Sequence, residues 1–173
     1  PDFAVPLAGG EPREMWADIA INRYIRDPLT GIVLGVRTTQ REYLIEHETS
    51  RARLEAVTDL FAKRKGISFS IDNFDADLST MIVTTSGNYD SGTWYRVEAD
   101  TGARAIIGLE RPAIQGRAIG KVSPFTYEAS DGLEIRGILT LPPDREPVDL
   151  PAIILPHGGP AARDRLGFDW WAQ

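Results

Sequence analysis

Apolar and polar residues alternate along most of the first 110 or so positions, in short runs separated by glycine, proline, asparagine and aspartate. This alternation predicts β-strands with one buried face. We expect strands at residues 31–39, 42–47, 67–71, 80–85, 93–98 and 103–109, with residues 86–92 as a loop. The last four strands occupy about 45 residues, the period of one β-propeller blade, and residues 19–47 have the pattern of most of another. A generic antiparallel meander is the alternative.

The periodicity changes once, near residues 50–65. Apolar residues recur there at spacings of three and four, at Leu54, Val57, Leu60 and Phe61. This spacing places them in one stripe on a helix. Thr49 or Ser50 could cap the start of the helix, and Gly66 could adopt the left-handed conformation that ends it. We therefore expect a mainly β chain with one helix in this part.

A different pattern begins after residue 110. Residues 110–122 have no clear periodicity and are predicted to be a linker. Residues 124–129 and 133–141 are expected to form a hairpin, because Asp131-Gly132 between alternating strands is a strong turn signal. Residues 152–155 are wholly apolar, which predicts a strand buried in the centre of a sheet.

The composition argues against several classes of protein. The chain has 173 residues, of which 42% are hydrophobic and 25% charged, with a net charge of −6. It has no dense run of lysine and arginine, which argues against binding to nucleic acid or to a membrane surface. No apolar run approaches the roughly 20 residues of a membrane-spanning helix. There is no cysteine, which excludes disulfides and thiol catalysis, and the two histidines argue against a histidine-rich metal site.

No motif indicates a cofactor or a metal. Asn73, Asp75 and Asp77 have the spacing of a calcium loop, but Leu78 and Thr84 stand where that loop needs Gly and Glu, so we interpret them as a solvated turn. The chain begins with Pro1, so we expect its native N-terminus, and any signal peptide, to be missing. We expect a cytoplasmic protein, with the periplasm or secretion as alternatives.

Residues 125–142 (FTYEASDGLEIRGILTLP), 155–160 (LPHGGP) and 162–164 (ARD) resemble the prolyl oligopeptidase family of serine peptidases. The resemblance is greatest to its acylaminoacyl-peptidase and dipeptidyl-aminopeptidase-like branch, in which a β-propeller precedes an α/β-hydrolase domain. It implies that residues 1–120 are the C-terminal part of a propeller, with about two blades and the helix. It further implies that residues 121–173 contain the first strands of an α/β-hydrolase domain, truncated before the nucleophile.

The candidate catalytic residues are His157, Gly158 and Gly159. Two glycines after a strand suit a loop in which the backbone approaches a substrate closely. The resemblance implies that this loop contributes to an oxyanion hole, together with the backbone N–H that follows the nucleophilic serine. The alternative is a strand-to-helix turn in which His157 packs locally. The chain has no G-x-S-x-G motif, so the Ser/Asp/His triad is absent and we expect the chain alone to be inactive.

The leading hypothesis is a fragment of a serine peptidase whose full-length parent hydrolyses short peptides through an acyl-enzyme. Carboxylesterase activity on the same superfold is one alternative, and a non-catalytic propeller-like module that binds protein is another. The partner we expect is a peptide substrate of the parent, with neither nucleic acid nor membrane. Unpaired strand edges also predict that the fragment self-associates. The specificity for peptides does not follow from the sequence.

Overall fold

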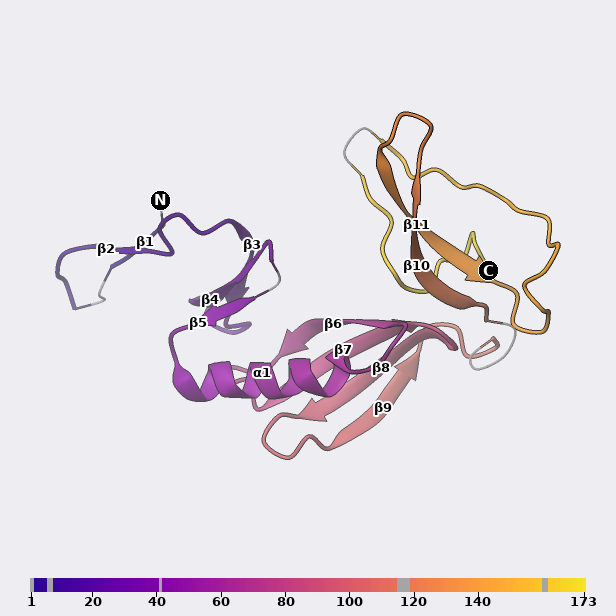
Figure 1. Cartoon of the computed structure of the whole chain (residues 1–173). Helices are drawn as coiled ribbons and strands as arrows, with labels where there is room; N and C mark the ends of the chain where they lie inside the picture. Colours follow the sequence, from indigo (N-terminus) through magenta and orange to yellow (C-terminus); the bar gives the residue numbers. More distant parts are fainter. Residues whose placement is uncertain (1, 6–7, 41, 115–118, 160–161) are drawn as a thin grey trace. The chain divides into compact units, whose positions relative to one another are not determined.

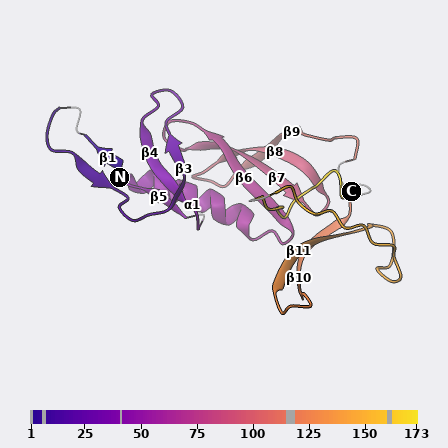
Figure 2. The same ribbon diagram turned by 90° about the horizontal axis from the view of Figure 1, so that it is seen from above.

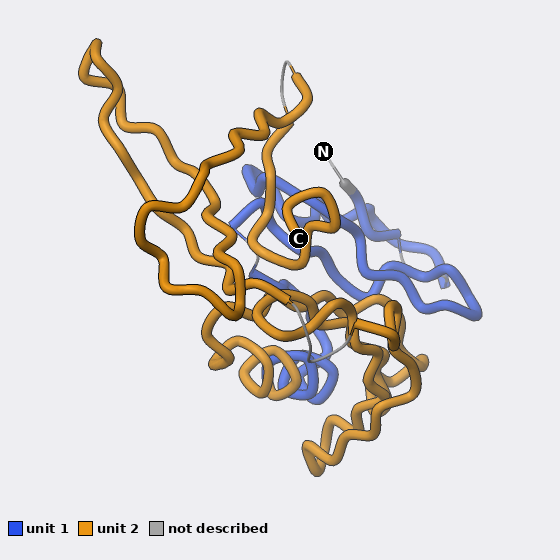
Figure 3. The backbone as a smooth tube through the Cα atoms, turned by 90° about the vertical axis from the view of Figure 1, so that its right-hand side faces the viewer, with its two compact units in different colours: residues 1–55 blue, residues 56–173 orange. Residues whose placement is uncertain are grey.

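The computed structural model describes residues 2–5, 8–40, 42–114, 119–159 and 162–173. Within these residues the chain is mainly β, with several antiparallel sheets and one helix (Figures 1 and 2). It divides into two compact units, residues 1–55 and residues 56–173, and the boundary falls inside the helix (Figure 3). This agrees with the expected mainly β class.

The first unit contains two small antiparallel sheets. Their strands are β1 (Asp2–Ala4) with β2 (Arg13–Met15), and β3 (Ile21–Arg26), β4 (Val33–Thr38) and β5 (Tyr43–Ile45) in that order. The strands predicted at residues 31–39 and 42–47 are confirmed as β4 and β5. Ile25, Val36 and Ile45 are buried, which stabilises the three-stranded sheet through removal of apolar surface from water.

The connection between β3 and β4 is organised by the carboxylate of Asp27. Its Oδ1 accepts hydrogen bonds from the backbone N–H groups of Thr30, at 2.7 Å, and Leu29, at 2.8 Å. These bonds favour the ionised form, so the Thr30 bond first and the Leu29 bond second hold the pKa of Asp27 below its ordinary value. Gly31 follows with a φ of 72°, a conformation that glycine adopts without strain.

We expect this turn to lose stability in acid. Because the pKa is lowered in the folded state, the contribution of Asp27 is present above the ordinary aspartate pKa and is lost as the pH falls through the lowered value. Asp27→Asn should therefore destabilise the protein at pH 7 and have less effect at pH 3, measured by unfolding and by the amide NMR signals of Leu29 and Thr30. Asp144→Asn, at an exposed position, is the control. A penalty for Asp27→Asn that is the same at both pH values would contradict this role.

The helix α1 spans Glu48–Ala62, so the helix predicted near residues 50–65 is confirmed with earlier ends. The predicted caps, Thr49 and Ser50, are wrong. The helix begins before them, and the backbone N–H of Ser50 donates instead to Nδ1 of His47 at 3.4 Å. The His47 carbonyl accepts from the Arg51 N–H at 3.0 Å, which makes His47 the N-cap. Gly66 has the predicted left-handed φ, 72°, but the helix ends at Ala62, four residues earlier, so Gly66 does not end it as predicted.

The second unit is built around a four-stranded antiparallel sheet. Its strands, in spatial order, are β6 (Ile67–Phe74), β7 (Thr80–Gly87), β8 (Asp90–Glu98) and β9 (Arg104–Leu109). The four predicted strands of this region are confirmed. The C-terminal half of α1 packs on one face of the sheet (Figure 1), where the Phe61 ring lies 5.8 Å from that of Phe69 and 5.5 Å from that of Tyr95.

The loop predicted at residues 86–92 is wrong. Strand β7 continues to Gly87 and β8 begins at Asp90, which leaves a tight turn. The buried carboxylate of Asp90 accepts hydrogen bonds from the hydroxyls of Thr85 and Thr93 and from the backbone N–H of Gly92. Polar turn residues indicated a loop, but these bonds satisfy the polar groups inside the sheet.

The predicted hairpin is confirmed as β10 (Lys121–Glu128) and β11 (Glu134–Leu141), which pair in antiparallel register. Residues 115–118 of the predicted linker lie outside the described residues. The buried strand predicted at residues 152–155 is wrong: this segment is irregular, and Ile153 and Ile154 are 85% and 89% exposed. A central strand needs a neighbour on each edge, and no described strand pairs with this segment.

Candidate functional site

The His157-Gly158-Gly159 loop lies in an irregular, exposed segment at residues 151–159. Nδ1 of His157 lies 2.9 Å from the carbonyl oxygen of Gly158. Because a carbonyl oxygen only accepts, Nδ1 carries the proton in this bond and donates it. The imidazole therefore uses its Nδ1–H within the loop.

The two glycines are not required by crowding within the described chain. A Cβ placed on Gly158 or Gly159 would meet no atom within 4 Å. Without side chains, Gly158 and Gly159 would let a substrate or another segment approach the backbone closely. The proposed role of these glycines in an oxyanion hole therefore remains a prediction.

The segment that follows the loop is anchored on the four-stranded sheet. The Phe168 N–H donates to Ser86 Oγ at 2.8 Å, and the Arg111 guanidinium lies over the Phe168 ring, 4.8 Å from its centre. Gln173 Oε1 accepts from the Gly120 N–H at 2.6 Å. These contacts connect the chain after the loop to strand β7 and to the segment that follows β9.

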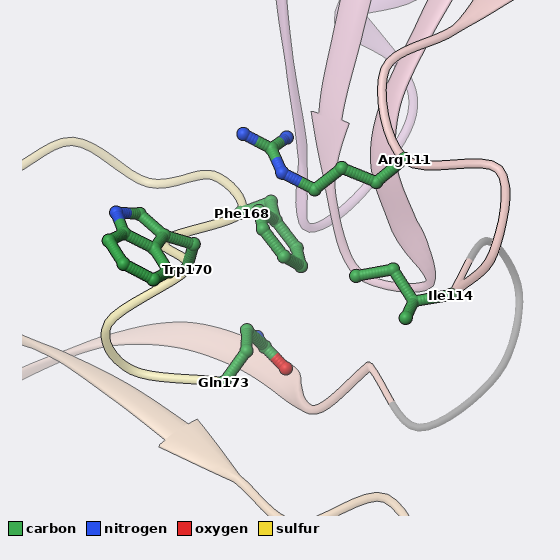
Figure 4. A pocket seen from close by; sticks show the side chains of 5 residues that line it. All are labelled: Arg111, Ile114, Phe168, Trp170 and Gln173. Atoms are coloured by element: carbon green, nitrogen blue, oxygen red, sulfur yellow. The ribbon is translucent and has the colours of Figure 1, made fainter.

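Beside this anchor lies an open cavity of about 450 Å³ (Figure 4). Its lining residues are Arg111, Ile114, Phe168, Trp170 and Gln173. The volume is within the range of small-molecule sites, and one guanidinium stands among mainly apolar walls. No local pattern indicates this grouping, because its members come from two segments more than fifty positions apart.

The His157 imidazole is not hydrogen-bonded as a catalytic base would be. Within residues 119–159 and 162–173, His157 has no hydrogen bond to a hydroxyl or a carboxylate.

Among all described residues, no group of three or more histidine, aspartate or glutamate side chains is arranged to hold a metal ion, and no helix is long and apolar enough to cross a membrane. Asp75 accepts from the Thr80 N–H at 3.0 Å, as expected for a turn.

Comparison with known proteins gives two informative relatives. The chain is 26% identical to dipeptidyl aminopeptidase BIII of Pseudoxanthomonas mexicana over 182 aligned positions, which cover 99% of this chain and 26% of that protein. It is 28% identical to dipeptidyl peptidase family member 6 of Caenorhabditis elegans over 148 positions, which cover 73% of this chain and 20% of that protein. No family model matches the chain, and no solved structure matches it.

The chain therefore spans about a quarter or less of the length of these two relatives. At this level of identity the matches support a distant relationship to dipeptidyl peptidases and a peptidase-like function.

Proposed function

We propose that this chain is part of a serine peptidase that hydrolyses short peptides through an acyl-enzyme. The observation that carries the proposal is the similarity to dipeptidyl aminopeptidase BIII, which extends over 99% of the chain and so includes both the antiparallel sheets and the His-Gly-Gly loop. A second relative with a dipeptidyl peptidase name supports the same reaction class.

In the proposed architecture, residues 1–120 form the end of a β-propeller and residues 121–173 the start of an α/β-hydrolase domain. The β6–β9 sheet would be one blade and the β3–β5 sheet most of another. The antiparallel pairing of consecutive strands within each sheet supports this assignment to blades. Strand β9 ends its sheet, and Ile106 and Ile107 are exposed on it, so this chain by itself would self-associate.

The proposed chemistry assigns the His157 loop to stabilisation of the oxyanion. Attack by a serine on the peptide carbonyl places negative charge on its oxygen, and backbone N–H groups directed at that oxygen lower the barrier. The serine, its histidine base and the acidic residue that orients the base would come from residues of the full-length protein outside this sequence. This chain alone would bind no acyl group.

The test compares the full-length protein with this chain. A fluorophosphonate probe, which reacts with an activated serine, should label the full-length protein and leave the 173-residue chain unlabelled. The labelled protein should hydrolyse a chromogenic dipeptidyl amide. Labelling of the 173-residue chain would show that the site is misassigned. Labelling of the full-length protein with turnover of esters but not of amides would replace the peptidase by a carboxylesterase.

A further inference from the structure

Arg23, Arg37 and Tyr43 form one row across the three strands β3, β4 and β5. Arg23 is the register partner of Arg37, and Arg37 is the register partner of Tyr43. Residues directly opposite one another in antiparallel strands project their side chains from the same face of the sheet. The Arg37 guanidinium lies over the Tyr43 ring, 5.5 Å from its centre, as this placement requires.

Two arginines at directly opposed positions are unfavourable unless an anion compensates them, because like charges face each other at close range. The ion pairs of the described residues include neither Arg23 nor Arg37. Moreover, Nε of Arg37 is buried and has no hydrogen-bond partner among them. The row therefore holds two positive charges on one face, and the buried Nε–H of Arg37 is not paired with any described residue.

We propose that this row binds the carboxylate of a peptide, with donors from both guanidiniums and with the Tyr43 ring holding the Arg37 side chain in place. A guanidinium presents a planar fork that matches the two oxygens of a carboxylate. Stacking on an aromatic ring reduces the freedom that the arginine would lose on binding. The net charge of −6 and the lack of a basic stripe argue against a nucleic acid phosphate as the anion.

The carboxylate has two sources, the C-terminus of a peptide or an acidic side chain. The choice of a peptide rests on the proposed function, but binding at this row requires no hydrolysis. The probes are three acetylated tripeptides: Ala-Gly-Ala with a free C-terminus, the same peptide as its amide, and Ala-Glu-Ala as its amide. Titration is followed by the NMR signal of the Arg37 Nε–H.

We expect the carboxylate peptides to shift the Arg37 signal and the neutral amide to leave it unchanged. A response to the free C-terminus alone identifies a peptide terminus as the ligand, and a response to Ala-Glu-Ala amide alone identifies an acidic side chain. A response to both shows that either carboxylate is accepted. Equal binding of the neutral amide, or no response to either carboxylate peptide, would overturn the proposal. Inorganic phosphate is titrated as a fourth probe, and a response to phosphate alone would also overturn the proposal.

Variants separate binding from folding. Arg37→Gln should weaken binding about tenfold, the loss typical of one charged hydrogen bond. Arg23→Glu should abolish binding and raise the melting temperature, because Glu at this position would pair with Arg37; a misfolded variant would melt lower.

The matched control is Arg26→Gln. Arg26 also lies over a tyrosine, 5.4 Å from the Tyr24 ring centre, but its register partner is Val33 and its guanidinium donates to the Gly31 carbonyl. This variant should bind as the unmodified chain does. An equal loss in Arg26→Gln, or unchanged binding in Arg37→Gln, would contradict the assignment. Because the experiment measures no turnover, neither result bears on the proposed peptidase activity, which the fluorophosphonate experiment tests separately.

Discussion

In the full-length protein, if it is the proposed peptidase, we expect His157→Ala to lower kcat more than it raises KM, by less than the roughly 100- to 1,000-fold that follows removal of a direct oxyanion donor. The imidazole donates through Nδ1 to the Gly158 carbonyl, 2.9 Å away, and so restrains the peptide units whose N–H groups would face the oxyanion. A group that acts on the transition state affects kcat more than the binding of substrate. The measurement is steady-state hydrolysis of a chromogenic dipeptidyl amide.

Two variants make this result specific. His157→Asn keeps a side-chain N–H that can bond to the same carbonyl, so it should recover much of the lost kcat if the histidine positions the loop. His47→Ala changes the other histidine, which caps α1, and should leave kcat unchanged at a temperature where the protein stays folded. An unimpaired His157→Ala enzyme would remove the loop from the catalytic machinery.

We expect Phe61→Ala to destabilise the second unit by about 3–5 kcal/mol, the cost of emptying a buried phenylalanine site. Phe61 is 1% exposed and its ring packs against Phe69 and Tyr95, so truncation leaves a cavity between the helix and the sheet. Amide hydrogen exchange in β7 and β8 measures this loss directly, because these strands form the interior of the sheet.

The control for this prediction is the same chemical change at an exposed site. Phe3 is 56% exposed, so Phe3→Ala should change stability by less than about 0.5 kcal/mol. Phe61→Leu, which refills part of the volume, should lose less than Phe61→Ala. If Phe61→Ala and Phe3→Ala had equal effects on exchange in β7 and β8, the packing of α1 on this sheet would be wrong.

Local patterns predicted most of the strands because each strand signal lies within its own residues. The alternation over residues 80–85 and 93–98, and the Asp131-Gly132 turn between two apolar runs, appear in the structure as β7, β8 and the β10–β11 hairpin. The helix was predicted from its apolar stripe for the same reason, since Leu54, Val57 and Phe61 are its buried apolar residues.

The errors arose where a residue's partner is not visible in the local pattern. The polar residues at 86–92 indicated a loop. However, the Asp90 carboxylate accepts hydrogen bonds from the hydroxyls of Thr85 and Thr93 within the sheet. The apolar run at residues 152–155 indicated a buried strand, yet an apolar run becomes a strand only where other strands pair with it, and no described strand does so.

The sequence by itself determined the mainly β class, the helix α1, the hairpin and the His-Gly-Gly motif, because propensity, periodicity and turn chemistry are properties of neighbouring residues. The tertiary structure decided which distant residues meet. Arg23, Arg37 and Tyr43 share a face only because the strand register aligns them, and Phe168 meets Arg111 only because the chain returns to the sheet. Such pairings depend on the free energy of the whole fold, which no local pattern records.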